Sequence, residues 1–260
     1  VYASIFHKNA KSDITATANK IEEERMAVVI QEVIGRETAG RLYPDISGAA
    51  RSRNHYPVDP LRMEDGLAAV CIGLGRQVSS CGKCLRFSPG QPKRIHQFHS
   101  TDSIIETSQS RFFAIPTVED DGNVRESEED NLLHLSLDSA EEDKRLALVG
   151  STYLSSDDRI VDSIRRGEGA RLVTFAPVLK HNKFPLAQIL DHVLKTCEDF
   201  LASPVELEFA IEVDEVQNVK KFAILQVRPL MDESVDIDIK LDEVDRDGAV
   251  CISSKSLGNG

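Results

Sequence analysis

The spacing of apolar positions predicts one long amphipathic helix at residues 185–202. Apolar side chains recur there three and four positions apart, which places them on one face of a helix. Pro185 opens the segment, where its missing N–H costs little because the first helical N–H groups have no partner within the helix. The apolar face consists of Leu186, Ile189, Leu190, Val193, Leu194, Cys197 and Leu201. We expect this face to pack against a sheet or a second helix.

Apolar runs earlier in the chain predict strands. Residues 26–35 are rich in β-branched residues and end in Gly35, which is typical of a mostly buried strand. Residues 46–54 begin with small residues, and we expect a strand in which Gly48 lets another group approach the backbone. Residues 66–75 form a third run, whose length alone does not separate a strand from a buried helix. Further strands are expected at residues 146–153 and 172–179.

Two alternating segments follow the predicted helix. Along residues 205–213, apolar side chains occupy the odd positions and three glutamates lie among the even ones. Residues 221–229 form the second segment, in which Gln226 and Arg228 lie two positions apart and therefore share a face. The polar link between the two segments predicts an antiparallel hairpin.

The register of this hairpin decides its chemistry. If the hairpin is centred near Gln217, Glu208 lies opposite Gln226 and Glu206 lies opposite Arg228. A slip of one residue would separate these pairs. Carboxylate and amide oxygens suit Mg²⁺, and the planar fork of an arginine suits a phosphate. An ordinary surface hairpin with a Glu–Arg pair is the alternative that the pattern leaves open.

From the predicted strands and the long helix we expect an α+β fold, in which a mixed or antiparallel sheet packs with helices. Composition fits a soluble globular protein. Of its 260 residues 41% are hydrophobic, which is enough for a core, and no apolar run is long enough to span a membrane. The net charge of −12 argues against binding to nucleic acid. Five irregularly spaced cysteines favour a reducing, cytoplasmic setting over a set of disulfides.

Two stretches are rich in polar or acidic residues. Residues 100–145 predict a polar excursion from the domain at residues 1–230, with a short apolar interruption at 112–118. Residues 231–260 predict an acidic tail or a connection to a further domain.

The hairpin sequences Glu-Leu-Glu-Phe-Ala-Ile at 206–211 and Ile-Leu-Gln-Val-Arg-Pro-Leu at 224–230 resemble the closing signature of the ATP-grasp domain in the phosphoenolpyruvate synthase and pyruvate phosphate dikinase family. The resemblance implies the distal part of that domain. It also implies that Glu208 and Gln226 hold Mg²⁺ and that Arg228 contacts the phosphates of ATP.

Residues 26–34 resemble the strand that forms the adenine hinge in this family. The resemblance implies that the backbone near Gln31, Glu32 and Val33 pairs with the edge of adenine. Backbone groups can read adenine whatever side chains the strand carries.

Two further stretches resemble the family in the expected order. Residues 46–54 resemble a strand of the Ser-Gly-Val-Ala-Phe-Thr-Arg-Asn-Pro type, which implies a site-lining role for Arg53. A sheet-edge cation is the alternative for that residue. Residues 73–75 resemble the family's Gly-Leu-Gly-Glu segment, but Arg76 stands where the family has Glu. This departure puts an acidic contact to the ribose in doubt.

The resemblance implies a parent enzyme that transfers phosphate from ATP through a phosphohistidine to pyruvate, forming phosphoenolpyruvate. Its cofactors would be ATP and Mg²⁺. We expect the upstream ATP-grasp half and the downstream phosphohistidine and pyruvate-binding domains to lie outside this chain, which would then be inactive alone. The alternative is a degenerate module that binds a nucleotide or a partner without catalysis. Arg76 favours this alternative, and the retained hairpin residues favour the enzyme.

A zinc module is a third hypothesis. Cys81 and Cys84 have ligand spacing, and His96 and His99 follow them. The two histidines are closer together than in a typical finger, and reduced cysteines in a glycine loop are the alternative.

Overall fold

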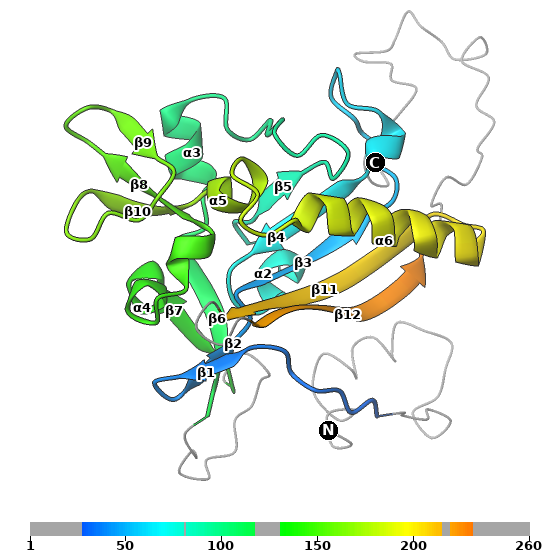
Figure 1. Cartoon of the computed structure of the whole chain (residues 1–260), viewed down its shortest axis with the longest axis horizontal. Coiled ribbons are helices and arrows are strands. Elements are labelled where there is room, and N and C mark those ends of the chain that lie inside the picture. The colour runs from blue at the N-terminus through cyan, green and yellow to red at the C-terminus, as the bar shows by residue number, and fades with distance from the viewer. Residues whose placement is uncertain (1–27, 81, 118–130, 215–218, 231–260) are drawn as a thin grey trace, which may run out of the picture.

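The structure is a computed structural model that describes residues 28–80, 82–117, 131–214 and 219–230. It is an α+β fold with three antiparallel sheets (Figure 1), which confirms the predicted fold class. The largest sheet has five strands in the order β12 (Val219–Pro229), β11 (Val205–Asp214), β3 (Ile46–Arg51), β4 (Leu67–Cys71) and β5 (Leu85–Phe87). Strands far apart in sequence therefore become neighbours, because β11 pairs with β3.

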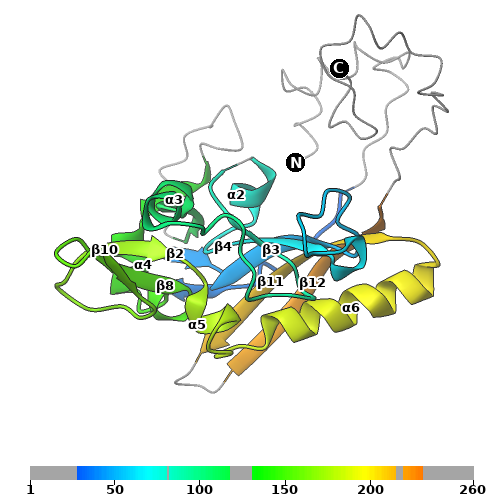
Figure 2. The same ribbon diagram turned by 90° about the horizontal axis from the view of Figure 1, so that it is seen from above.

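Helix α6 (Leu186–Leu201) covers one face of this sheet (Figure 2). Leu186, Leu190 and Leu194 of the helix are buried against the odd-numbered apolar residues of β11. Alternation along β11 sends its even-numbered residues to the other face, which we call the open face. The short helix α2 (Arg76–Ser79) lies on that second side (Figure 2).

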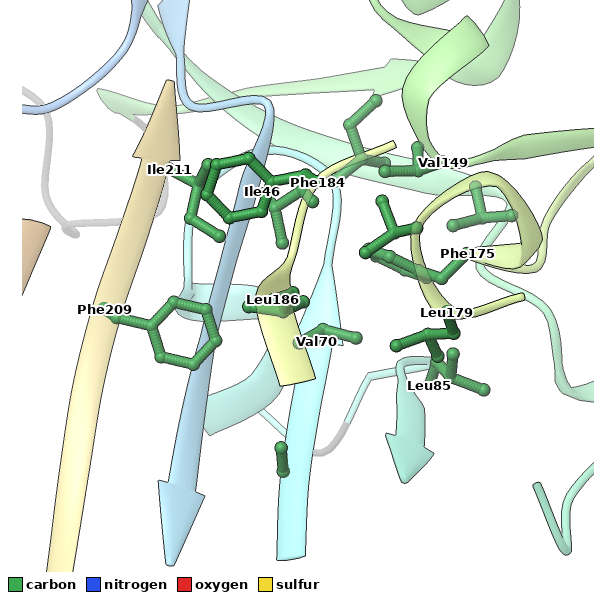
Figure 3. Packing of buried hydrophobic residues seen from close by; sticks show 14 of the residues in the cluster. Ile46, Val70, Leu85, Val149, Phe175, Leu179, Phe184, Leu186, Phe209 and Ile211 are labelled. Carbon is green, nitrogen blue, oxygen red and sulfur yellow. The ribbon is translucent and has the colours of Figure 1, made fainter. Parts of the chain in front are cut away.

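Phe209 lies in the core (Figure 3). Its ring fills the space beside Gly48. The two residues are cross-strand partners, and a Cβ at Gly48 would lie 3.1 Å from Cζ of the Phe209 ring. Phe209 is fully buried and stacks on Phe222 at 5.3 Å between ring centroids. A Cβ at Gly48 would also lie 2.2 Å from the backbone carbonyl oxygen of Ala69 on the neighbouring strand. The prediction that Gly48 lets another group approach the backbone is therefore confirmed, and the nearest such group is this carbonyl, followed by the Phe209 ring.

Two smaller sheets complete the fold. A four-stranded sheet has the order β1 (Arg36–Thr38), β2 (Arg41–Tyr43), β6 (Arg111–Pro116) and β7 (Leu133–Ser136). A three-stranded sheet has the order β10 (Ala170–Val173), β8 (Gly150–Leu154) and β9 (Arg159–Val161). The remaining helices are short: α3 (Thr101–Thr107), α4 (Leu137–Glu142), α5 (Ala176–Leu179) and the 3-10 turns η2 (Met63–Asp65) and η4 (Leu146–Leu148).

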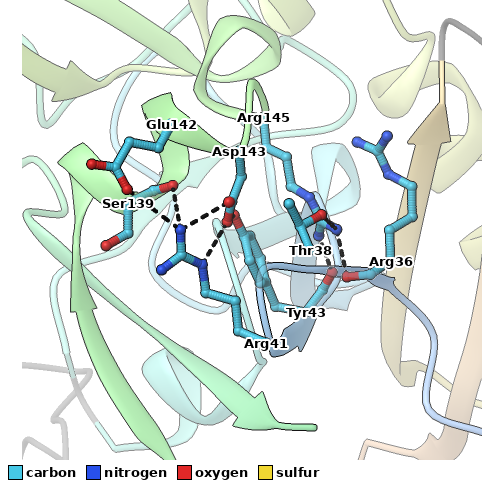
Figure 4. Close-up of polar contacts among 8 residues, drawn as sticks. All are labelled: Arg36, Thr38, Arg41, Tyr43, Ser139, Glu142, Asp143 and Arg145. Carbon is cyan, nitrogen blue, oxygen red and sulfur yellow. Dashed lines mark hydrogen bonds and ion pairs between the residues drawn. The ribbon is translucent and has the colours of Figure 1, made fainter. Parts of the chain in front are cut away.

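Arg145 fixes the β1–β2 hairpin from inside the protein (Figure 4). Its guanidinium is buried, donates to the backbone carbonyls of Arg36 and Tyr43, and lies 4.1 Å from the centroid of the Tyr43 ring. Burial lowers the pKa of Arg145. Nearby, Arg41 donates two hydrogen bonds of 2.8 Å to the carboxylate of Asp143. The Tyr43 hydroxyl donates to the same carboxylate at 2.6 Å. This polar cluster joins the four-stranded sheet to α4.

Most predicted elements are confirmed. The helix at 185–202, the strand at 46–54 and both hairpin strands match α6, β3, β11 and β12. The run at 66–75, for which the sequence left strand and buried helix open, forms the strand β4. The predictions for 146–153 and 172–179 are right in part, since η4 precedes β8 in the first and α5 follows β10 in the second.

The strand predicted at 26–35 is wrong for the part that the structure describes. Residues 28–34 form no regular element, and Val29 and Ile30 are 86% and 94% exposed. The segment contacts β12 through side chains. A β-branched composition gives a strand only where another backbone pairs with it, and no described strand does so here.

The described residues of the polar stretch at 100–145 contribute α3, β6, β7 and α4. The predicted acidic tail at 231–260 lies outside the described residues. Among the helices that the structure describes, none is long and apolar enough to cross a membrane.

Candidate functional site

The β11–β12 hairpin has the register predicted from its sequence. Glu206 pairs with Arg228 and Glu208 pairs with Gln226. Beyond Glu208 the register shifts, so that Phe209 pairs with Ile224 and Leu225 is left as an extra residue in a β-bulge.

The bulge decides which face Gln226 and Arg228 use. Phe222 lies opposite Ile211 and packs against the core. Without the extra residue, Gln226 and Arg228 would share the face of Phe222 because side chains alternate with period two. Leu225 resets this alternation and turns both polar side chains to the open face.

The open face carries Glu208 and Gln226 on a floor of small residues. Both side chains are exposed and directly opposed. Glu208 faces Ala49 on its other side, and Ala49 in turn pairs with Ala69. Two adjacent oxygen donors beside alanines leave room for a hydrated Mg²⁺, which usually takes only one or two protein ligands.

Glu206 lies at one end of this face between two arginines. Its carboxylate accepts from Arg51 Nε at 2.5 Å and from Arg228 Nε at 3.0 Å, and the Arg228 guanidinium makes a second bond to it. Glu206 is buried, whereas the side chains of Arg51 and Arg228 are 51% and 58% exposed. Burial alone would raise the pKa of Glu206, but the hydrogen bonds from Arg228 and Arg51 outweigh burial and lower it.

Acid should weaken the fold through Glu206. Because its pKa is lowered in the folded state, the unfolded chain binds protons first as the pH falls through the ordinary glutamate range, about 4. The stabilisation from Glu206 is complete above that range and is lost below it. We expect Glu206→Gln to flatten the decline in the free energy of unfolding between pH 7 and pH 3, measured by urea titration. Parallel curves for the variant and the parent protein would contradict this.

Gln31 and Glu32 lie along the outer edge of the hairpin. Gln31 Nε2 donates to the carbonyl of Leu225 at 3.1 Å, and Glu32 lies 3.7 Å from the Lys221 ammonium. Val33 is 47% exposed. The structure therefore brings this segment beside the strand that carries Gln226 and Arg228, although the segment itself is not a strand.

Arg53 is not brought to the open face. It donates to Glu198 of α6 at 2.7 and 3.0 Å and lies 3.6 Å from Glu64. These ion pairs with Glu198 and Glu64 favour the alternative of a sheet-edge cation.

Residues 73–75, which we call the glycine loop, border the other end of the open face. Ser47 donates to the carbonyl of Gly73 at 2.5 Å, and Gly75 lies close to the Ser47 side chain before Arg76 begins α2. Gly73 has a φ of +84° and lies against Phe112 and Phe113, so that its conformation and its packing both favour glycine.

The zinc hypothesis gains no support from the described residues. Cys81 lies outside them, Cys84 is buried, and His96 and His99 are exposed. Within the described ranges, no group of three or more His, Cys, Asp and Glu side chains could hold a metal ion.

Arg51 is the site residue for which the sequence gives no signal. Its contact with Glu206 depends on the pairing of β3 with β11, and 155 positions of sequence separate the two residues. The pairing of two strands that are adjacent in sequence can be predicted from their local pattern. The identity of a third strand beside them, far away in sequence, cannot.

A family model described as pyruvate phosphate dikinase, AMP/ATP-binding domain, matches residues 1–246. The match covers every described element, including both hairpin strands. No curated protein shows a significant match to the chain.

Proposed function

The chain belongs to the pyruvate phosphate dikinase, AMP/ATP-binding domain family, and on that premise we propose that the open face of its five-stranded sheet binds ATP together with Mg²⁺. The observation that carries the proposal is the hairpin register. It pairs Glu208 with Gln226, two residues along the strand from Arg228. On this proposal, the two metal ligands and the phosphate-binding cation share one exposed surface.

Each predicted site residue except Arg53 has a role in this proposal. Glu208 and Gln226 hold Mg²⁺, which when bound neutralises phosphate charge. Arg228 donates to the phosphate oxygens. The segment at Gln31, Glu32 and Val33 contacts the adenine end, since it lies along the same strand. Such a site acts by positioning and by balancing charge.

In the parent protein we assign this surface to the first step of a phosphoryl transfer from ATP, by way of a phosphohistidine, to pyruvate. The acceptor histidine, the pyruvate site and the other half of the nucleotide site would belong to partner domains of the same protein. Alone, this chain would bind the nucleotide without completing the reaction.

A degenerate module that binds a nucleotide without catalysis is the second candidate. Arg76 at the position of the family Glu favours it. Phosphohistidine formation by the full-length protein separates the two candidates, since the degenerate module would bind ATP and transfer nothing.

Calorimetric titration with adenylyl imidodiphosphate, a non-hydrolysable ATP analogue, tests the proposal. We expect chelation of Mg²⁺ by EDTA to weaken binding about tenfold, because the metal links the phosphates to Glu208 and Gln226. AMP, which lacks the outer phosphates, serves as the control and should bind equally with and without Mg²⁺. Binding of the analogue that ignores Mg²⁺ would contradict the assigned metal site.

A further inference from the structure

Arg51 and Arg228 flank one buried carboxylate, Glu206, on three adjacent strands of the open face. We propose that these two arginines act as a pair that binds the outer phosphates of a polyphosphate ligand, with Glu206 holding both in position. The inference rests on the proposed function and adds a second phosphate-binding residue, Arg51, to that site.

The sheet places the two arginines on opposite sides of the carboxylate. Glu206 pairs directly with Arg51 of β3 and with Arg228 of β12. Since neighbouring strands lie about 4.8 Å apart, the two arginine backbones are separated by roughly 10 Å. Both side chains lean inward to Glu206, which brings their guanidinium groups together above β11.

Both guanidinium groups keep N–H groups directed to solvent. Each has five N–H donors, and Glu206 takes one from Arg51 and two from Arg228. With 51% and 58% of their side-chain surfaces exposed, the two arginines present further donors on the open face. A phosphate is the ligand that such forked donors fit best.

Charge also favours an anion at this position. The two guanidinium groups and the Glu206 carboxylate together carry one excess positive charge, which the nearby Glu208 carboxylate balances until Glu208 holds Mg²⁺. A single arginine would be enough to neutralise the buried Glu206, so the second cation exceeds what the fold requires. It does so on a chain whose net charge is −12.

The metal-binding pair is within reach of the same ligand. Glu208 and Gln226 lie two residues along their strands from Glu206 and Arg228, which corresponds to roughly 7 Å. A polyphosphate can therefore contact Mg²⁺ at one pair and the arginines at the next. A monophosphate cannot extend to both.

Arg51 stands at the Phe position of the Ser-Gly-Val-Ala-Phe-Thr-Arg-Asn-Pro pattern that residues 46–54 resemble. Arg51→Phe is therefore a substitution with a precedent at this position of the strand. Arg51→Lys keeps the charge and removes the planar fork.

Calorimetric titrations of the full chain with inorganic tripolyphosphate, adenylyl imidodiphosphate and AMP test the pair. We expect Arg51→Phe to weaken tripolyphosphate and the ATP analogue about tenfold and to leave AMP within twofold, because a charge-assisted contact to the outer phosphates is lost. Arg51→Lys should fall between the parent protein and Arg51→Phe. Arg159→Phe, which replaces an exposed strand arginine in a different sheet, is the matched control and should change nothing.

The outcomes separate this inference from the proposed function. If Arg51→Phe binds tripolyphosphate and the ATP analogue as tightly as the parent protein does, the arginine pair is wrong and the proposed ATP site is unaffected. Arg51-dependent binding of tripolyphosphate without binding of either nucleotide would support the pair and overturn the ATP site. If the parent protein binds none of the three ligands, both are wrong. Thermal melting of each variant shows whether it is folded.

Discussion

Replacing Phe209 by alanine should lower the free energy of unfolding by about 3–5 kcal/mol. The ring is fully buried, fills the space beside Gly48 and stacks on Phe222. Its loss removes apolar area and leaves a cavity that a glycine backbone on one side cannot fill. Urea unfolding followed by circular dichroism measures the change.

Phe200 offers a matched control for this substitution. It is 87% exposed near the end of α6, so Phe200→Ala should change stability by less than about 0.5 kcal/mol. Equal effects of the two substitutions would contradict the described core.

Replacing both Glu208 and Gln226 by alanine should weaken binding of the Mg²⁺-bound ATP analogue about 30-fold, or roughly 2 kcal/mol. The variant loses both oxygen donors of the proposed metal site. We expect a larger effect than that of removing Mg²⁺, because the metal-free nucleotide carries more negative charge and the arginines attract it more strongly. Isothermal calorimetry in excess Mg²⁺ measures the loss.

Two controls make this result specific. In EDTA the double variant and the parent protein should bind the analogue within threefold, since neither uses a metal there. Glu168→Ala removes one negative charge from an exposed loop before β10 and should leave affinity unchanged. A 30-fold loss that persists in EDTA would mean that Glu208 and Gln226 contact the nucleotide directly.

The pairing of Glu208 with Gln226 and of Glu206 with Arg228 was predictable because its signals are local. Alternation along residues 205–213 indicates which side chains share a face, and a short link to β12 limits the possible registers. The bulge at Leu225 was not predictable, since no glycine or proline marks it. The predicted register, centred on Gln217, holds only for residues that the bulge separates from the turn. Glu208 is one of these residues, so its predicted partner Gln226 was right.

Long-range pairing accounts for what the sequence could not predict. Arg51 joins the site only through the neighbouring strand β11. Arg53, two positions later, pairs with Glu198 of α6 because β3 ends at Arg51 and the strand alternation ends with it. Residues 28–34 show the converse, since a strand-like composition alone did not produce a strand.

The buried Arg145 has a consequence for the order in which the chain folds. Its bonds to the carbonyls of Tyr43 and Arg36 join positions 102 and 109 residues apart. The entropy of closing so long a loop must be offset before these contacts contribute. We therefore expect the β1–β2 hairpin to reach its final environment late, after α4 has arrived, and the local pairing of its two three-residue strands to do little to nucleate folding.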